Sequence, residues 1–113
     1  MTEQIKVFHE KAMAGDAVAQ YNMGQAYMMG AMGSPDPAEA ANWWRKAAEQ
    51  GLAAAQFNLA LTYLNHDTGM TSSENLLSAT TWLKMAAKQG HEQAKEVLDD
   101  LENDMERALR KER

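Results

Sequence analysis

Residues 40–63 read AANWWRKAAEQGLAAAQFNLALTY, and this stretch decides the fold. Alanines and other strong helix formers run up to Gly51, and the alanines resume directly after it. A helix that ends abruptly is commonly followed by a residue in the left-handed conformation, which glycine adopts at the lowest cost. The pattern therefore predicts two antiparallel helices joined by a tight turn at Gly51. Small side chains along their contact let two such backbones approach closely.

The same pattern occurs three times, around Gly15, Gly51 and Gly90, at intervals of 36 and 39 residues. Alanine lies three residues before and four residues after each glycine: Ala12, Ala48 and Ala87, then Ala19, Ala55 and Ala94. A large apolar residue follows each glycine by eight: Met23, Leu59 and Leu98. Repeats of this length are typical of stacked helical units.

The chain is predicted to be all-α, because Ala, Glu, Gln, Lys, Leu and Met dominate it and Val and Ile together number only four. Asp36 followed by Pro37 is a strong signal for a helix start. The predicted helices span residues 3–14, 17–29, 37–50, 53–65, 73–89 and 91–110. The adjacent Trp43 and Trp44 point about 100° apart on a helix. We therefore expect one in the core of its own pair and the other against the neighbouring pair.

Composition narrows the function classes. The net charge is −5, and the basic residues near the end, in RALRKER, are interleaved with acids, so a nucleic-acid partner is not expected. The chain has no cysteine and no apolar run long enough for a membrane span. We expect a cytoplasmic protein with no membrane, metal or cofactor partner.

The strings AAEQG, AQYNMGQAY, AQFNLALTY and A-x-x-W-W-R-K-A-A resemble the Sel-one-like repeat, a relative of the tetratricopeptide repeat. The resemblance covers roughly residues 5–98. It implies antiparallel helix pairs stacked into a short right-handed α-solenoid, which binds a protein or peptide on its concave face. It also implies a bacterial adaptor or regulatory role, and an inhibitor of the immunity type is one concrete form of that role.

Two departures from the family pattern bear on the organisation of the chain. The usual loop after Tyr63 is replaced by NHDTGMTSSENL, and the third unit carries Asp99 and Glu102 where close-packing residues are expected. The last helix is therefore interpreted as a polar cap, which solenoids need for solubility. The resulting division is a single domain over 1–113: a half repeat at 3–15, repeats at 16–51 and 52–90, and a capping helix at 91–110.

The predicted partner-binding residues lie on the first helix of each repeat, opposite its core stripe. They are Asn22, Gln25, Met29, Asn58, Leu61 and Asn65. Asn22 and Asn58 recur in register, and side-chain amides can bind the backbone of an extended peptide because each carries donors and an acceptor. The alternative is structural, since asparagine belongs to the family's usual string and can hold a neighbouring helix.

Met28, Met29 and Met32 allow a second hypothesis, because flexible thioethers are common at adaptable surfaces. Either this segment supports self-association into a homodimer, or it folds back onto its own core.

A third hypothesis, a small enzyme, has little support. The Asp67-Thr68-Gly69 triplet matches the aspartic protease string but occurs once, and that chemistry needs two facing aspartates. The three histidines lack metal-ligand spacing, so the chain is predicted not to be an enzyme.

Overall fold

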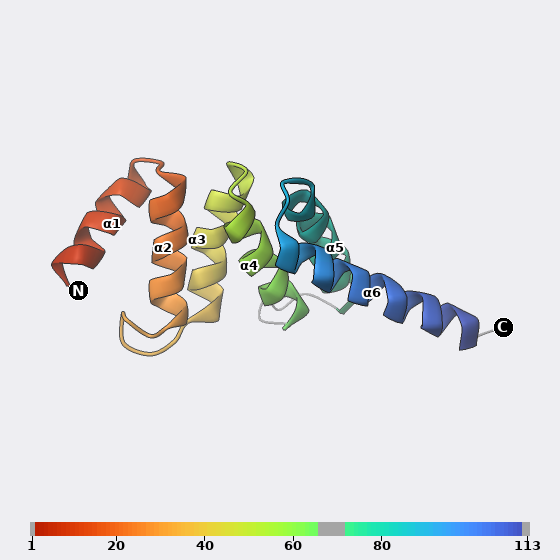
Figure 1. The fold of residues 1–113 in the computed structure, drawn as a ribbon. Helices are drawn as coiled ribbons and strands as arrows, with labels where there is room; N and C mark the ends of the chain where they lie inside the picture. The colour runs from red at the N-terminus through yellow and green to blue at the C-terminus, as the bar shows by residue number, and fades with distance from the viewer. Residues whose placement is uncertain (1, 66–71, 112–113) are drawn as a thin grey trace.

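The computed structural model describes residues 2–65 and 72–111, with the side chains of residues 72 and 73 left out, and these residues form six helices and no strand (Figure 1). The helices are α1 (Glu3–Met13), α2 (Ala17–Met28), α3 (Pro37–Glu49), α4 (Ala53–Leu64), α5 (Ser72–Lys88) and α6 (Glu92–Lys111). The all-α prediction is confirmed, and every predicted boundary lies within one residue of the observed one.

The helix ends follow from local chemistry. Thr2 caps α1, and Asp36 caps α3 by accepting a 3.1 Å hydrogen bond from the Glu39 amide, with Pro37 in the first turn. Gly51 has a φ of 95°, its amide donates to the Ala48 carbonyl, and the next amide donates to the Ala47 carbonyl. This double hydrogen bond is the Schellman motif. The same arrangement occurs at Gly15 and Gly90.

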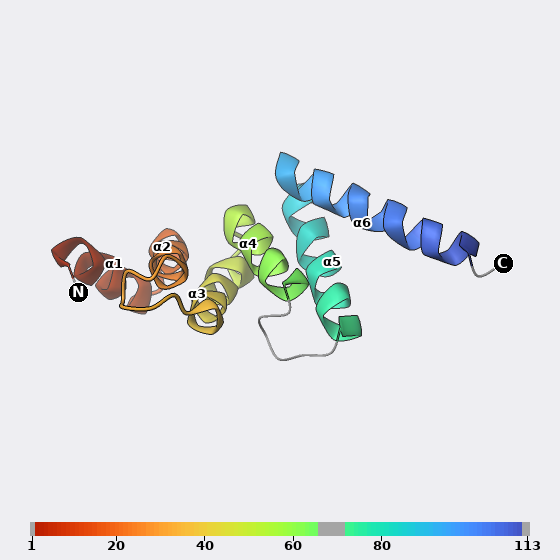
Figure 2. The same cartoon turned by 90° about the horizontal axis from the view of Figure 1, so that it is seen from below.

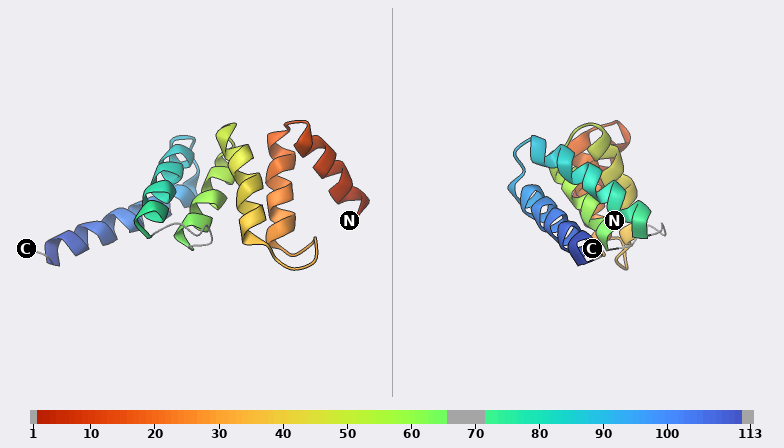
Figure 3. Two further views of the ribbon diagram at one scale, coloured as in Figure 1. Left: turned by 180° about the vertical axis from the view of Figure 1, so that it is seen from behind. Right: turned by 90° about the vertical axis from the view of Figure 1, so that its right-hand side faces the viewer.

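The helices stack in a row, and each packs mainly against its neighbour in the chain. The molecule is accordingly elongated, with extents of 58 × 29 × 17 Å. Seen from below, α2 and α4 lie toward one side of the row and α3 and α5 toward the other (Figure 2). Helix α6 starts beside α5 and extends away from the body, as the view from behind also shows (Figure 3). The architecture is a short right-handed α-solenoid of antiparallel helix pairs, as predicted.

Alanines form the close contacts between helices. Ala40, Ala47, Ala55, Ala60 and Ala79 are among the fully buried ones in the main core, which runs from α3 to the start of α6. Small side chains let the helices approach, and large residues then fill the remaining space.

The two adjacent tryptophans serve different clusters. Trp44 joins the main core, whereas Trp43 packs with Ala12, Ala19 and Met23 in a second cluster between α1, α2 and α3. Their angular separation on α3 thus links successive helix pairs, as expected.

Glutamines tie each unit to the next. Gln50, at the end of α3, donates 3.0 Å and 2.8 Å hydrogen bonds to the Gly15 carbonyl and the Gln20 side-chain oxygen. Gln20 in turn donates to the carbonyl of Ala12 at 3.2 Å. One repeat later, Gln89 bonds to Gly51 and Gln56 at 2.8 Å and 3.1 Å, and Gln56 donates to Ala48 at 3.2 Å. Each network joins two glutamine side chains and two backbone carbonyls. It ties the glycine turn at the end of one unit to the last helix of the next unit.

Candidate functional site

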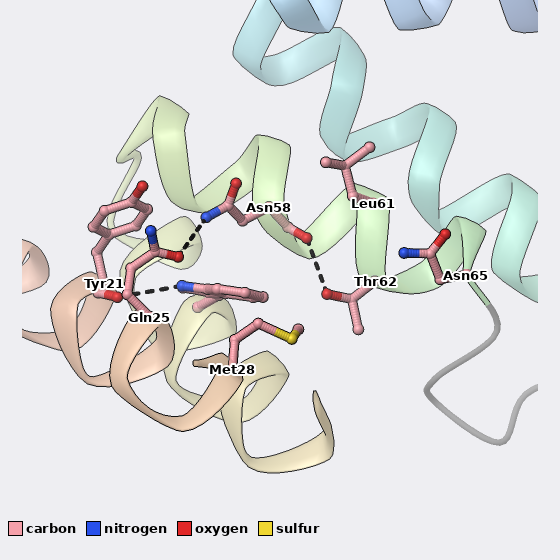
Figure 4. A pocket seen from close by; sticks show the side chains of 8 residues that line it. Tyr21, Gln25, Met28, Asn58, Leu61, Thr62 and Asn65 are labelled. Carbon is pink, nitrogen blue, oxygen red and sulfur yellow. Dashed lines mark hydrogen bonds between the residues drawn. The ribbon is translucent and has the colours of Figure 1, made fainter. Parts of the chain in front are cut away.

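A groove of about 300 Å³ lies where α2 and α4 run beside each other above α3 (Figure 4). Eight residues line it: Tyr21, Gln25 and Met28 from α2, Trp44 from α3, and Asn58, Leu61, Thr62 and Asn65 from α4. The groove thus combines aromatic and aliphatic surface with side-chain amides.

Trp44 is the aromatic part of the groove and is held firmly. It is almost fully buried, and its indole Nε1 donates a 3.2 Å hydrogen bond to the Tyr21 carbonyl on α2. The indole packs directly against Gly24, where a side chain would overlap it. The lack of a side chain at Gly24 therefore lets α3 and α2 approach closely at this groove.

The polar part of the groove is a pair of amides from two repeats. Asn58 Nδ2 donates a 3.1 Å hydrogen bond to Gln25 Oε1, so α4 and α2 are linked across the groove (Figure 4). Each amide carries an NH₂ group and a carbonyl oxygen, and this bond uses one group from each. One NH₂ group and one carbonyl oxygen remain available to a ligand. This count is the same if both amides are turned over.

Leu61, Thr62 and Asn65 complete the α4 side of the groove. The Thr62 hydroxyl donates to the Asn58 carbonyl at 3.0 Å, so its donor is used by its own helix, and the residue is almost fully buried. Asn65 is exposed at the end of α4.

The structure brings four of the six predicted residues together: Gln25, Asn58, Leu61 and Asn65 all line the groove. Asn22 and Met29 do not line it, although they lie on the same helix or its cap. Asn22 is half-buried, and Met29 is 79 % exposed. Sequence reasoning missed Trp44, Tyr21, Met28 and Thr62 as groove residues, and the recurrence of an aromatic at 21 and 57 was the signal for one of them.

The methionine segment is only partly exposed. Met28 lines the groove, and Met32 packs against the cluster of Ala12, Met23 and Trp43. The loop therefore folds back onto its own core at Met32, which was one of the two alternatives. Met29 alone among these three methionines is exposed, whereas Met28 and Met32 are half-buried.

Other kinds of site are not apparent in the described part of the chain. Across residues 2–65 and 72–111 no group of three or more His, Asp or Glu side chains could hold a metal ion. Within the same ranges, no helix has the length and apolar character needed to cross a lipid bilayer. His66 and the Asp67-Thr68-Gly69 triplet lie outside the described residues.

Paired helices, glycine turns and a repeating glutamine network define a short α-solenoid of repeated helix pairs. The family assignment is specific, because the Sel1 repeat model matches residues 17–52 and 53–91. The chain belongs to the Sel1 repeat family. Sel1 repeats generally mediate protein–protein interaction and are typically non-enzymatic scaffolds.

Two of the solved structures that resemble this chain illustrate the likeness. A Sel1 repeat protein from Oxalobacter formigenes superposes with a TM-score of 0.77 at 29 % identity, over 85 % of this chain and 70 % of that one. A protective antigen of uropathogenic Escherichia coli with an SLR fold superposes with a TM-score of 0.73 at 34 % identity, over 83 % of this chain and 20 % of that one.

Among curated proteins, an F-box protein of Arabidopsis thaliana is 38 % identical over 57 residues, which are 50 % of this chain and 16 % of that protein. The chain therefore spans a small part of this relative and of the Escherichia coli antigen. Their whole-protein roles do not transfer to it directly.

Proposed function

We propose that this chain is a non-enzymatic protein-interaction module that binds an extended segment of another protein in the groove between α2 and α4. We assign the concave, partner-binding face of the solenoid to this groove. The observation that carries the proposal is the amide pair Gln25–Asn58, bonded at 3.1 Å across the groove beside Trp44.

The hydrogen-bonding groups that the Gln25–Asn58 bond leaves unused match those of a peptide backbone. An extended peptide residue offers one N–H donor and one carbonyl acceptor. The amide pair offers one carbonyl oxygen and one NH₂ group, so it can bind the two together. Such binding does not depend on the side chains of the bound segment.

The apolar part of the groove adds side-chain preference. A space of about 300 Å³ is at the small end of ligand pockets. It suits one apolar anchor side chain, packed between Trp44, Met28 and Leu61, rather than a whole small molecule. A mostly preformed groove also implies little rearrangement of this chain on binding.

The proposed role is that of an adaptor or regulator, with an immunity-type inhibitor as a specific form. An adaptor holds its partner through this groove, whereas an inhibitor covers the partner's working surface with it. The family assignment supports a protein partner, and the lack of cysteine in the sequence fits a cytoplasmic setting.

A peptide-display selection on the immobilised chain tests the proposal. Selected peptides are synthesised and titrated against wild type, the double variant Gln25→Ala/Asn58→Ala, and the control Gln93→Ala/Asn103→Ala. The control removes two exposed amides from α6, outside the groove. Circular dichroism checks that all three proteins stay helical.

We expect the groove variant to lose about tenfold or more in affinity, since each lost hydrogen bond contributes about 1 kcal/mol. The control should bind like wild type. In ¹H–¹⁵N spectra, the side-chain NH₂ signals of Gln25 and Asn58 should move on binding, while that of Asn103 stays in place. Equal affinity for both double variants, or a selection that enriches no peptide, would contradict the proposal.

A further inference from the structure

Beyond Leu101, none of the described residues of α6 packs against the main core. Helix α6 has 20 residues, whereas α2 and α4, at the same place in the repeat, have 12 each. Every described residue from Glu102 onward is exposed. The apolar stripe of the helix nevertheless continues through this part, since Met105 and Leu109 follow Leu101 at a spacing of four. Leu109 is 63 % exposed, so this stripe is presented to solvent.

The stripe borders an apolar groove. Helices α5 and α6 meet at the Gly90 turn and diverge from there (Figure 2). Between them Leu76, Leu77, Thr80 and Met105 line a space of about 290 Å³. Leu77 is 70 % exposed at this groove. Together with Leu109, these four residues form what we call the α5–α6 surface.

The charges of α6 are unevenly distributed along its length. Its first fifteen residues hold one base, Lys95, and the acids Glu92, Glu96, Asp99, Asp100, Glu102, Asp104 and Glu106. Its last five residues hold no acid and the bases Arg107, Arg110 and Lys111. Two copies of this helix laid antiparallel would therefore place the basic end of each beside the acidic stretch of the other.

We propose that the α5–α6 surface binds a second copy of this chain, with the two α6 helices antiparallel across a two-fold axis near Met105. The exposed stripes of the two copies then cover each other, and Leu109 of one copy meets the groove of the other. A two-fold contact of this kind closes at a dimer. The surface is separate from the α2–α4 groove, so this inference does not depend on the proposed peptide binding.

Other occupants fit less well. A parallel pair of α6 helices would set like charges side by side. An anionic lipid surface is repelled by the seven acids of the helix. A further repeat packed as α3 packs on α2 would need small and aromatic residues where α6 has Asp99 and Glu102, both exposed. The acid-and-base division favours a second copy of the same helix.

The dimer should be weak and sensitive to salt. The free half of α6 is about 15 Å long, which puts the contact at the small end of specific interfaces. Exposed charge pairs are screened as ionic strength rises. We expect the average mass, measured by sedimentation equilibrium, to rise from monomer toward dimer between low micromolar and near-millimolar protein, and to fall again with added salt.

Two sets of variants test which surface is used. Leu77→Asp/Met105→Asp should abolish the rise in mass. The matched control, Val18→Asp/Met29→Asp, replaces two apolar residues that are also exposed but lie on and just after α2, and it should dimerise like wild type. Loss of dimer in the control but not in the first variant would overturn the proposal and favour the methionine segment.

Charge reversal tests the antiparallel geometry. A basic-end variant, Arg107→Glu/Arg110→Glu/Lys111→Glu, and an acidic-stretch variant, Asp99→Lys/Asp100→Lys/Glu102→Lys, should each stay monomeric alone. Mixed together they should form a heterodimer, because each then offers the charge that the other lacks. Circular dichroism confirms that α6 remains helical. A wild type that stays monomeric at every concentration, one that grows beyond a dimer, or variants that do not associate when mixed would overturn the proposal.

Discussion

The indole of Trp44 lies directly against the backbone of Gly24, and its Nε1 donates a 3.2 Å hydrogen bond to the carbonyl of Tyr21 one turn earlier on α2. In the next repeat, Ala60 occupies the position of Gly24, 36 residues on, and Leu83 occupies the position of Trp44, 39 residues on. Both are fully buried. The sizes change together, since the larger partner Trp44 meets the smaller Gly24. Close packing between the two helices of a repeat is thus achieved with two different pairs.

Gly24→Ala should therefore destabilise the chain by about 1–3 kcal/mol through overpacking. Alanine is the better helix former by about 1 kcal/mol, and this gain offsets only part of the cost. Urea unfolding followed by circular dichroism measures the difference. The check is Trp44→Leu, which copies the second repeat: Gly24→Ala/Trp44→Leu should be clearly more stable than the sum of the two single changes predicts. Additive single effects would show that Gly24 and Trp44 do not constrain each other.

The glutamine network gives a second prediction. Gln50→Ala and Gln89→Ala each remove two hydrogen bonds that join neighbouring units. Both side chains are partly solvated, so we expect a loss of about 1 kcal/mol for each. The two side chains share no hydrogen-bond partner, so their effects should add approximately. Gln93→Ala, on the exposed face of α6, serves as the control and should leave the urea midpoint unchanged.

Much of this fold could be predicted from the sequence because its determinants are local. A glycine after an alanine-rich run predicts a helix end by itself, and all three such glycines have positive φ and Schellman hydrogen bonds. The Asp36-Pro37 start is equally local. The glutamine network was not predicted, although the string AAEQG was recognised, because Gln50 acts on residues 30 and 35 positions earlier.

The candidate site was predicted only in part, because periodicity along one helix does not show which side chains meet across two helices. Helical periodicity placed Gln25 and Asn58 on the face that lines the groove, but it could not show that they bond to each other. It also treated Asn22 and Asn58 as equivalent. Asn58 faces α2, the corresponding helix of the preceding repeat, and donates a hydrogen bond to Gln25 on it. The helix before α2 is α1, which corresponds to α3, so Asn22 has no matching amide partner among the described residues.

Gly51 offers a test of the turn that separates backbone conformation from packing. Its φ is 95°, yet a Cβ placed there would meet nothing within 4 Å. Gly51→Ala should cost about 1–2 kcal/mol, because an L-residue is strained in this conformation. A semisynthetic protein with D-alanine at position 51 is the control. It should be at least as stable as wild type in thermal unfolding, because D-residues prefer positive φ. Equal losses for both alanines would point to a steric cause instead.

His91 is predicted to stabilise the start of α6. Its Nδ1 accepts a 3.1 Å hydrogen bond from the Ala94 amide, and its ring lies 4.7 Å from that of Phe57 between centroids. His91→Ala should lose the cap and about 1 kcal/mol of stability. His91→Asn keeps a capping oxygen while removing the ring contact. We expect Asn to recover most of the loss in thermal unfolding. If it recovers none, the contact with Phe57 rather than the cap is the stabilising interaction.

Helix α6 should also be unevenly stable along its length. Ala94 is fully buried and Val97, Leu98 and Leu101 pack against the main core, whereas every described residue from Glu102 on is exposed. An unsupported helix of about ten residues is marginal in water. In dilute protein, amide hydrogen exchange should therefore be slow from residue 96 to about 101 and fast from 103 to 111. Ala12 on α1, buried in the cluster with Met23 and Trp43, gives an internal reference for a packed terminal helix. Uniformly slow exchange along α6 in dilute monomeric protein would mean that its own ion pairs, such as Arg110–Glu106 and Arg107–Asp104, are enough to hold the free half as a helix.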